Sequence, residues 1–201
     1  MRAVMALVVS ALVAGCQTAQ PVRLTAQAPA DDLASYRVAG PARIFGQALL
    51  RQSGGDVVTC AGEDAALIPA VSPMNEAMKV WGRGETIDAD GLDGRPISKA
   101  IRWSRCDAEG NFAFERLPER DFWIMAPVRW TAAKNAGQGG MLARRIAVDR
   151  GGAERVILSQ HDVRYLSARP WEIWNAVPPE PAEDDQSSSD VSVSYSRMSP
   201  G

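Results

Sequence analysis

The chain has 201 residues, 24 acidic and 22 basic side chains, and a formal net charge of −2. This balance, with no clustered basic stretch, argues against a nucleic-acid-binding protein, and we expect no nucleic-acid partner. Hydrophobic residues make up 46% of the chain, which is enough for one folded domain of ordinary size.

The first fifteen residues have the layout of an export signal. Arg2 supplies a single positive charge, and the segment 3–14 is apolar apart from Ser10. A bilayer span takes about 20 apolar residues, so this run is too short to cross a membrane. It suits the hydrophobic region of a signal peptide, and we predict that residues 1–15 take no part in the fold.

The segment 12–16 reads Leu-Val-Ala-Gly-Cys. It resembles the lipobox of bacterial lipoproteins, in which the cysteine carries a diacylglycerol and becomes the new N-terminus. The resemblance implies that Cys16 is lipidated and attaches the protein to a membrane beyond the cytoplasm. Gln17 stands where many inner-membrane lipoproteins have aspartate, which favours the periplasmic side of the outer membrane. A buried helix, or a secretory signal that contains a cysteine by chance, is the alternative.

Two stretches lack the periodicity of folded segments. Residues 16–39 are rich in Ala, Gln, Pro and Asp, which predicts a lipidated N-terminus followed by a flexible tether. Residues 177–201 include a run of Pro, Glu, Asp and Ser that cannot bury enough apolar surface to become ordered. We therefore expect a disordered tail there, and a folded domain with a C-terminal extension over residues 40–176. The alternating run 191–195 could add a strand to a partner.

Between residues 40 and 160, apolar and polar positions alternate with the period of two that marks β-strands. The first predicted strand places Ile44, Gly46, Ala48 and Leu50 on one face. The inward face of the longest strand is formed by Phe122, Ile124, Ala126, Val128 and Trp130. Shorter extended segments are predicted at 57–58, 64–69, 97–105, 112–114, 142–148 and 156–158. Short strands joined by Gly- and Pro-rich turns predict a mainly β protein, an antiparallel β-sandwich of about seven strands.

One short helical insertion interrupts the predicted strands. Its apolar residues recur with the i, i+3, i+4 and i+7 spacing of one helical face: Met74, Ala77, Met78 and Trp81. Ser72 is the candidate N-cap, with Pro73 at the first helical position, and Gly82 is the predicted end. We expect this helix to lie over the sandwich.

Three phrases of the sequence carry a resemblance to a known family. They are 44–48 (Ile-Phe-Gly-Gln-Ala), 67–69 (Leu-Ile-Pro) and 107–118, which begins Asp-Ala-Glu-Gly-Asn-Phe-Ala-Phe and ends Leu-Pro. These phrases resemble the carboxypeptidase regulatory-like domains, which are prealbumin-like (transthyretin-like) sandwiches. The resemblance implies Greek-key topology and no catalytic residue, because such domains generally serve as folding, docking or binding modules. The long stretch 74–98 departs from the family, as does 119–121, where a glycine is usual.

The cysteines divide into one lipid site and one pair. With Cys16 assigned to lipid, Cys60 and Cys106 remain, and an even pair in an oxidising compartment predicts a disulfide. Such a bridge would stabilise the fold by roughly 3 to 4.5 kcal/mol in the chain-entropy model. Two separate free thiols are the alternative.

Groupings that carry catalysis or bind metals are poorly represented. His161 is the only histidine and no nucleophile elbow accompanies it, so we predict a protein that is not an enzyme. One histidine and two bridged cysteines supply too few ligands for zinc. The acidic turn 88–94 suggests calcium, but Leu92 and Lys99 stand where an EF-type loop needs oxygen ligands. We expect no metal and no cofactor, and a looser calcium site stays open.

Aromatic residues supply the candidate contacts with a ligand or partner. Most tryptophans are expected to be packing residues, but Trp123 is out of phase with the inward face of its strand. An exposed Trp123 beside Arg129 could stack on a sugar ring. Residues 164–174 are too apolar for a free tail. There, Trp171 and Trp174 either pack back onto the domain or form a patch for a partner or a membrane interface.

These features predict a membrane-anchored envelope lipoprotein whose sandwich is a non-catalytic scaffold or a docking module for an envelope protein. A module that binds glycan or peptidoglycan through exposed tryptophan and loop residues is the alternative. A hydrolase that uses His161 is the third hypothesis.

Overall fold

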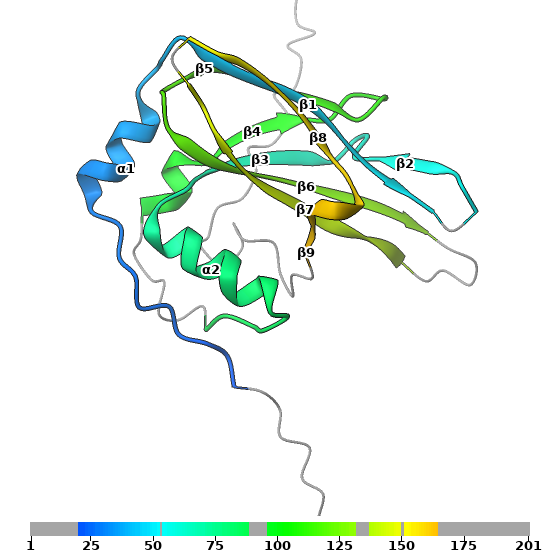
Figure 1. The fold of residues 1–201 in the computed structure, drawn as a ribbon, viewed down its shortest axis with the longest axis horizontal. Coiled ribbons are helices and arrows are strands. Elements are labelled where there is room, and N and C mark those ends of the chain that lie inside the picture. The colour runs from blue at the N-terminus through cyan, green and yellow to red at the C-terminus, as the bar shows by residue number, and fades with distance from the viewer. Residues whose placement is uncertain (1–19, 53, 89–95, 132–136, 150, 165–201) are drawn as a thin grey trace, which may run out of the picture.

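The computed structural model describes residues 20–52, 54–88, 96–131, 137–149 and 151–164. Within them, two β-sheets face each other as a sandwich (Figure 1), which confirms the fold class predicted from the alternating sequence. None of the described helices is long and apolar enough to cross a membrane.

The described residues form strands, two α-helices and two 3-10 turns. The strands are β1 (Ala42–Arg51), β2 (Val57–Thr59), β3 (Asp64–Pro69), β4 (Arg102–Arg105), β5 (Asn111–Leu117), β6 (Asp121–Thr131), β7 (Gly137–Ala147), β8 (Ala153–Leu158) and β9 (Val163–Arg164). The helices are α1 (Ala30–Arg37) and α2 (Ser72–Gly82), and the 3-10 turns are η2 (Pro96–Ala100) and η4 (Gln160–Asp162).

The four-stranded sheet is built around β1. One edge of β1 pairs antiparallel with β5 and, further along, with β2. At the junction, the amide of Ala48 donates to the carbonyl of Gly110 (3.1 Å) and its own carbonyl accepts from the amide of Cys60 (3.0 Å). The opposite edge of β1 pairs with β8, which runs parallel to it. The sandwich is therefore not wholly antiparallel, because alternation in a sequence shows the face of a strand but not its direction.

The five-stranded sheet has the order β4-β3-β6-β7-β9 and is antiparallel throughout. Its longest ladder joins β6 to β7 along their whole length. The core lies between the two sheets and contains the inward residues of both: Ile44, Ala48, Phe112, Phe114, Leu67, Phe122, Ile124, Leu142, Val156 and Leu158. Each large apolar side chain buried in this way contributes roughly 1.5–3 kcal/mol.

Helix α2 lies on the outer face of the five-stranded sheet (Figure 1). The predicted apolar stripe is buried along its whole length: Met74, Ala77, Met78 and Trp81. The helix ends at Gly82 as expected, but the N-cap is Val71 rather than Ser72, and no side chain caps it. Instead, Asn75 donates through Nδ2 to the carbonyl of Ala70 (2.7 Å).

The segment 97–105, predicted as one strand, divides in two. Its first part belongs to the 3-10 turn η2, and only β4 is extended. Ile97 and Ala100 are both buried, which suits residues three apart on a tight helical turn. The apolar spacing of this short segment is compatible with either structure, so the sequence pattern did not separate them.

Residues 20–39, predicted as part of a flexible tether, pack against the domain. Leu24, Leu33 and Tyr36 are buried, the last two on helix α1. The carboxylate of Glu76 on α2 accepts hydrogen bonds from the amides of Thr25 (3.0 Å) and Ala26 (2.7 Å). The tether prediction is wrong here because backbone groups of a segment with little periodicity find their partners on another element. Residues 16–19, with the expected lipid site Cys16, and the predicted tail 177–201 lie outside the described residues.

Candidate functional site

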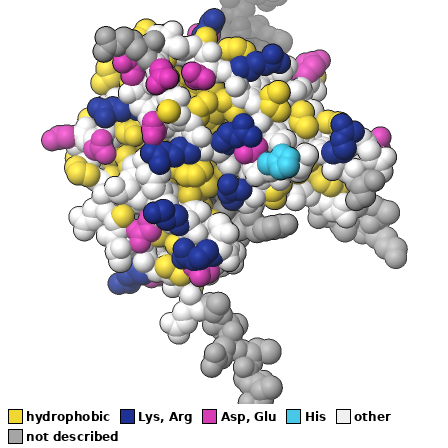
Figure 2. All heavy atoms as spheres, viewed as in Figure 1, with side chains coloured by type: hydrophobic (Ala, Val, Ile, Leu, Met, Phe, Trp, Pro, Cys, Tyr) yellow, Lys and Arg dark blue, Asp and Glu magenta, His cyan; other side chains and the backbone are white. Residues whose placement is uncertain are grey.

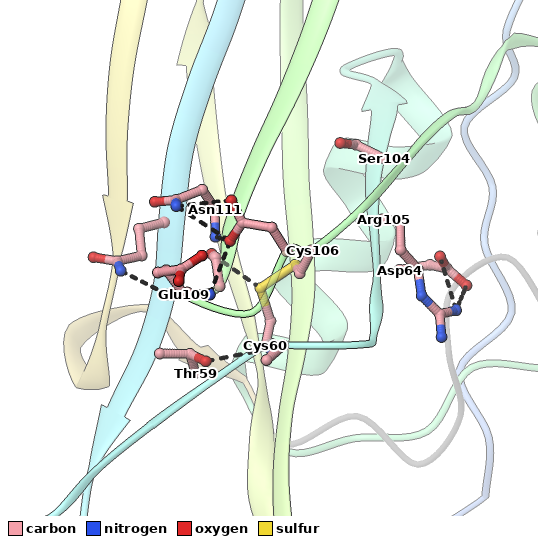
Figure 3. The surroundings of a disulfide bond; sticks show 12 residues. Thr59, Cys60, Asp64, Ser104, Arg105, Cys106, Glu109 and Asn111 are labelled. Atoms are coloured by element: carbon pink, nitrogen blue, oxygen red, sulfur yellow. Dashed lines mark hydrogen bonds and ion pairs between the residues drawn. A yellow bond between two sulfur atoms is a disulfide. The ribbon is translucent and has the colours of Figure 1, made fainter.

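Cys60 and Cys106 form a disulfide, with their Cα atoms 5.8 Å apart, as the sequence predicts (Figure 3). The bridge joins the residue after β2 to the residue after β4, and these strands belong to different sheets. Backbone hydrogen bonds flank it, since the amide of Cys106 donates to Glu63 (2.9 Å) and the amide of Gly62 donates to Cys106 (3.1 Å). The disulfide thus holds the two sheets together at one corner of the sandwich.

The turn from β4 to β5 starts directly after this disulfide. Oδ1 of Asp107 accepts from the amides of Glu109 (3.0 Å) and Asn111 (2.8 Å), and Nδ2 of Asn111 donates to the same carboxylate (2.9 Å). These hydrogen bonds, first that of the Asn111 side chain, hold the pKa of the Asp107 carboxyl below its ordinary value. Gly110 has a φ of 79°, a region that disfavours other residues. The turn therefore fixes Asn111 at the start of β5.

An exposed aromatic ring stands on the outer face of the four-stranded sheet. Phe45 of β1 is 39% exposed while its neighbour Ile44 is fully buried, because alternate residues of a strand face opposite sides. The register places Phe45 beside Ala113 of β5 on one side and Arg155 of β8 on the other. The side chain of Ala113 is too short to cover the ring.

The next row of this face combines amide groups with a second exposed apolar side chain. Gln47 of β1 lies between Asn111 of β5 and Ile157 of β8, and Ile157 is 47% exposed. Nε2 of Gln47 donates to the carbonyl of Glu109 at 2.7 Å. Both amide side chains are thus held in place beside exposed apolar surface. We call Phe45, Gln47, Asn111, Arg155 and Ile157 the Phe45 face.

Two hollows meet at Phe45. The larger, about 460 Å³, is lined by the other members of the Phe45 face together with Ser104, Arg105 and Asp107. The smaller, about 260 Å³, is lined by Arg43, Ala113 and Glu115. Ligand pockets in proteins commonly span about 300–1,000 Å³ and combine apolar walls with a few polar groups. The larger hollow has that size and that mixed lining.

The backbone beneath the Phe45 face is tightly packed. A Cβ atom at Gly46 would collide with the carbonyl oxygen of Val156 and stand 2.8 Å from the ring of Phe112. Glycine therefore allows β8 and the core aromatic residue to approach β1 closely. The amide of Ala113 on β5 donates to Oγ of Ser104 at 3.0 Å, which ties the edge of this sheet to β4. The strands that present the face are therefore closely packed.

The predicted contacts Trp123 and Arg129 lie on β6, on the outer face of the other sheet. Trp123 is half-buried and its Nε1 donates to Oδ1 of Asn75 on α2 (2.9 Å), which fixes the orientation of the indole. It lines a hollow of about 560 Å³ between α2 and the sheet, with Trp81 among the other walls. Arg129 lies 4.0 Å from the carboxylate of Glu63. Neither residue belongs to the Phe45 face.

Trp171 and Trp174, the other predicted contacts, lie outside the described residues. On the side of the molecule shown in Figure 2, Lys and Arg side chains are interspersed with hydrophobic and acidic ones. Charge therefore does not single out one site on that side.

His161 is exposed in η4, and its side chain forms no hydrogen bond with a described residue. The adjacent Asp162 is buried and accepts from Nε (2.8 Å) and Nη2 (2.7 Å) of Arg144, which makes it a structural partner. Within the described ranges, no three His, Cys, Asp or Glu side chains gather in a group that could hold a metal ion.

These features define a two-sheet β-sandwich with an open polar and aromatic face. The fold of this chain is similar to the crystal structure of a candidate carbohydrate-binding protein from Pseudomonas aeruginosa. The TM-score is 0.56 and the sequence identity is 22%, over 67% of this chain and 99% of that one. Two structures of BcpA, the major pilin subunit of Bacillus cereus, match with 12% identity and TM-scores of 0.34 and 0.35, over 61% of this chain and 29% of theirs. No protein-family model and no curated protein matches the sequence.

Sequence reasoning missed the Phe45 face, although one signal for it was present. In the first predicted strand, Ile44 and Gly46 share one face, which places Phe45 on the opposite face. A large aromatic side chain on that face is the feature that marks an exposed patch. Asn111 and Ile157 come from distant segments, and only the pairing of the strands brings them beside Gln47.

Proposed function

We propose that this protein is a lipid-anchored, non-catalytic module of the bacterial envelope that binds glycan at the Phe45 face. The observation that carries this proposal is the exposed Phe45 ring between two hollows, flanked by fixed amide groups. The anchor rests on the lipobox-like segment that ends at Cys16, which favours the outer membrane.

The chemistry of the Phe45 face suits a sugar. A pyranose ring has an apolar face of C–H groups, which packs on an aromatic ring, and hydroxyl groups on its rim. Phe45 and Ile157 offer apolar surface, while the side-chain amide oxygens of Gln47 and Asn111 offer acceptors for sugar hydroxyl groups. Because the two hollows follow one another along β1 and meet at Phe45, the ligand we propose is an extended glycan that runs along this strand.

The similar structure from Pseudomonas aeruginosa supports this proposal through its name, as a candidate carbohydrate-binding protein. At 22% identity this likeness shows a shared fold only. Glycan binding is therefore proposed mainly from the side chains of the Phe45 face.

Docking of an envelope protein is the second candidate function. Among the described strands, β8 pairs only with β1, so its other edge can accept an added strand from a partner. This edge lies next to Arg155 and Ile157, and a bound protein would cover the same face.

Co-sedimentation with purified cell wall tests the glycan proposal, using the mature protein in detergent. We expect Phe45→Ala and Asn111→Ala to lower the affinity for cell wall about tenfold each, as for contacts at the centre of a binding site. Val57→Ala is the matched control, because Val57 is an apolar residue on β2 that is 48% exposed and outside the face. Unchanged binding by the Phe45 variant, or a loss confined to Trp123→Ala, would contradict the proposal.

The anchor and the absence of catalysis are tested separately. Labelling cells with a palmitate analogue should mark the native protein and not Cys16→Ser, and cell fractionation should place the native protein in the outer membrane. A His161→Ala gene should restore every phenotype of a deletion strain. Failure of that complementation, with normal protein levels, would point to a hydrolase.

A further inference from the structure

Another hollow lies where α1, η2, β4 and the end of β5 meet. Its volume is about 360 Å³ and it shares no lining residue with the hollows at Phe45. Four cationic side chains line it: Arg37, Lys99, Arg102 and Arg116. No carboxylate is among its lining residues, and none of the four cations forms an ion pair with a described carboxylate.

Arg102 is a fixed positive charge in the wall of this hollow. Its Nη1 donates to the carbonyls of Glu115 (3.2 Å) and Arg116 (3.0 Å), and its Nη2 donates to those of Tyr36 (3.2 Å) and Val38 (3.3 Å). Main-chain carbonyls hold the guanidinium in place but do not neutralise it. Burial lowers the pKa of Arg102, and the charge of Arg116 lowers it further. The site thus bears a half-buried charge that a bound anion would stabilise.

The backbone of Arg116 has a left-handed conformation that glycine adopts more readily than other residues. Its φ of 53° is the only positive value at a non-glycine residue among the described residues. Such a conformation is unfavourable for a residue with a side chain, and strain of this kind is concentrated at functional sites. Arg37 and Lys99 are exposed and come from α1 and η2, so the four cations that line the hollow come from four separate elements.

We propose that this hollow, lined by Arg37, Lys99, Arg102 and Arg116, is a binding site for a ligand that carries a phosphate group. A phosphate group carries about −1.5 to −2 charge and three acceptor oxygens, which matches several cations better than one carboxylate does. Arginine and lysine are the usual partners of phosphate. The hollow is large enough for more than the anionic group itself, so a phosphorylated organic molecule fits. This site goes beyond the proposed function, because it lies apart from the Phe45 face.

The phosphate can come from a soluble ester or from a lipid headgroup, and calorimetry on the mature protein in neutral detergent distinguishes them. The probes are inorganic phosphate, glucose 1-phosphate, and dihexanoyl phosphatidylglycerol below its micelle concentration. Unphosphorylated glucose is the matched probe without the anion. Binding of the first two identifies a soluble ligand, and binding of the lipid alone identifies a headgroup; either result supports the site if the variants below abolish it.

The variants remove charge from the exposed members of the site. We expect Arg37→Gln and Lys99→Gln to weaken phosphate binding about three- to tenfold each, and their combination to weaken it further. Arg120→Gln is the matched control, since Arg120 is an exposed arginine outside the lining. Arg102→Gln is unsuitable alone, because it also removes the hydrogen bonds that Arg102 donates to carbonyls of α1, of Val38 and of β5.

Arg116→Gly separates binding from folding. Glycine accepts a φ of 53° without strain, so we expect this variant to unfold at a temperature no lower than the native protein while phosphate binding falls at least about threefold. The proposal is overturned if none of the phosphate probes binds, if glucose binds as well as glucose 1-phosphate, or if Arg120→Gln weakens binding as much as the site variants do. Retained binding by a folded Arg116→Gly protein also counts against it.

Discussion

The ring of Tyr36 meets the ring of Phe122 edge-on, with centroids 5.2 Å apart and ring planes at 86°. Both side chains are buried, and burial raises the pKa of the Tyr36 hydroxyl. An aromatic pair in this geometry contributes about 0.5–1.5 kcal/mol beyond its buried area. The contact fastens α1 to the start of β6 and thereby closes one end of the sandwich.

Removing this ring should destabilise the domain. Because Tyr36 is 6% exposed, Tyr36→Ala should lower the free energy of unfolding by about 3 kcal/mol. Tyr36→Phe keeps the ring and should change it by less than about 1 kcal/mol. Urea denaturation followed by tryptophan fluorescence measures both. Equal stability of the alanine variant and the native protein would mean that α1 is not docked in solution.

The two helices show how much of the fold the sequence could predict. Helix α2 was predictable because Met74, Ala77, Met78 and Trp81 repeat the spacing of one buried face. Helix α1 was not, because it buries only Leu33 and Tyr36 and is otherwise small or charged. A helix with only two buried side chains is stabilised mainly by its contacts with the rest of the domain. These contacts depend on residues distant in the sequence, such as Phe122.

The disulfide should contribute much of the stability. The two cysteines are 46 residues apart, and the chain-entropy model gives about 4 kcal/mol for a loop of this length. Replacing both Cys60 and Cys106 by alanine should therefore lower the midpoint of urea denaturation substantially. Thiol labelling of the protein without substitutions, denatured in the absence of a reductant, should modify neither Cys60 nor Cys106. Efficient labelling of both would show that the bridge does not form in the cell.

The turn before β5 should respond to pH through Asp107. A carboxyl whose pKa is lowered by folding stabilises the folded state above its unfolded pKa, and this contribution is lost as the pH falls through the folded value. Asn111→Ala removes the largest cause of the lowered pKa, so the titration midpoint of Asp107 should rise. A carbon-detected NMR titration of the carboxyl measures it, with Gln47→Ala as a control that leaves the Asp107 contacts in place. A midpoint that does not rise would contradict the assigned hydrogen bonds.

The candidate site was harder to predict than the strands, for a physical reason. Alternation identifies which residues of a strand share a face, and Phe122 and Ile124 are buried as expected. It does not identify which strands are neighbours, and β8 beside β1 brings Ile157 to Gln47. Trp123 was a reasonable candidate for an exposed ring because it is out of phase, but α2 covers that face of the sheet and Asn75 binds its indole.

Arg144 of β7 and Asp162 of η4 form an ion pair where η4 joins β8 to β9, strands of the two different sheets. The side chain of Asp162 is only 8% exposed, and its carboxylate also accepts from the amide of Ser159 at 2.9 Å. Asp162→Ala should therefore lower the free energy of unfolding by about 2 kcal/mol, the usual range for hydrogen bonds to a charged group. Asp149→Ala, at an exposed aspartate in the preceding turn, is the matched control and should have little effect.

A double-mutant cycle separates the pair from the turn that Asp162 also stabilises. Arg144→Ala alone should destabilise less than Asp162→Ala, because Arg144 is 42% exposed and solvent replaces part of its contact. The double variant should show a coupling of about 1 kcal/mol between the two side chains. The remaining loss in Asp162→Ala then belongs to the hydrogen bond from Ser159. A coupling near zero would mean that the hydrogen bond from Ser159 stabilises η4 and that the ion pair contributes little to the free energy of unfolding.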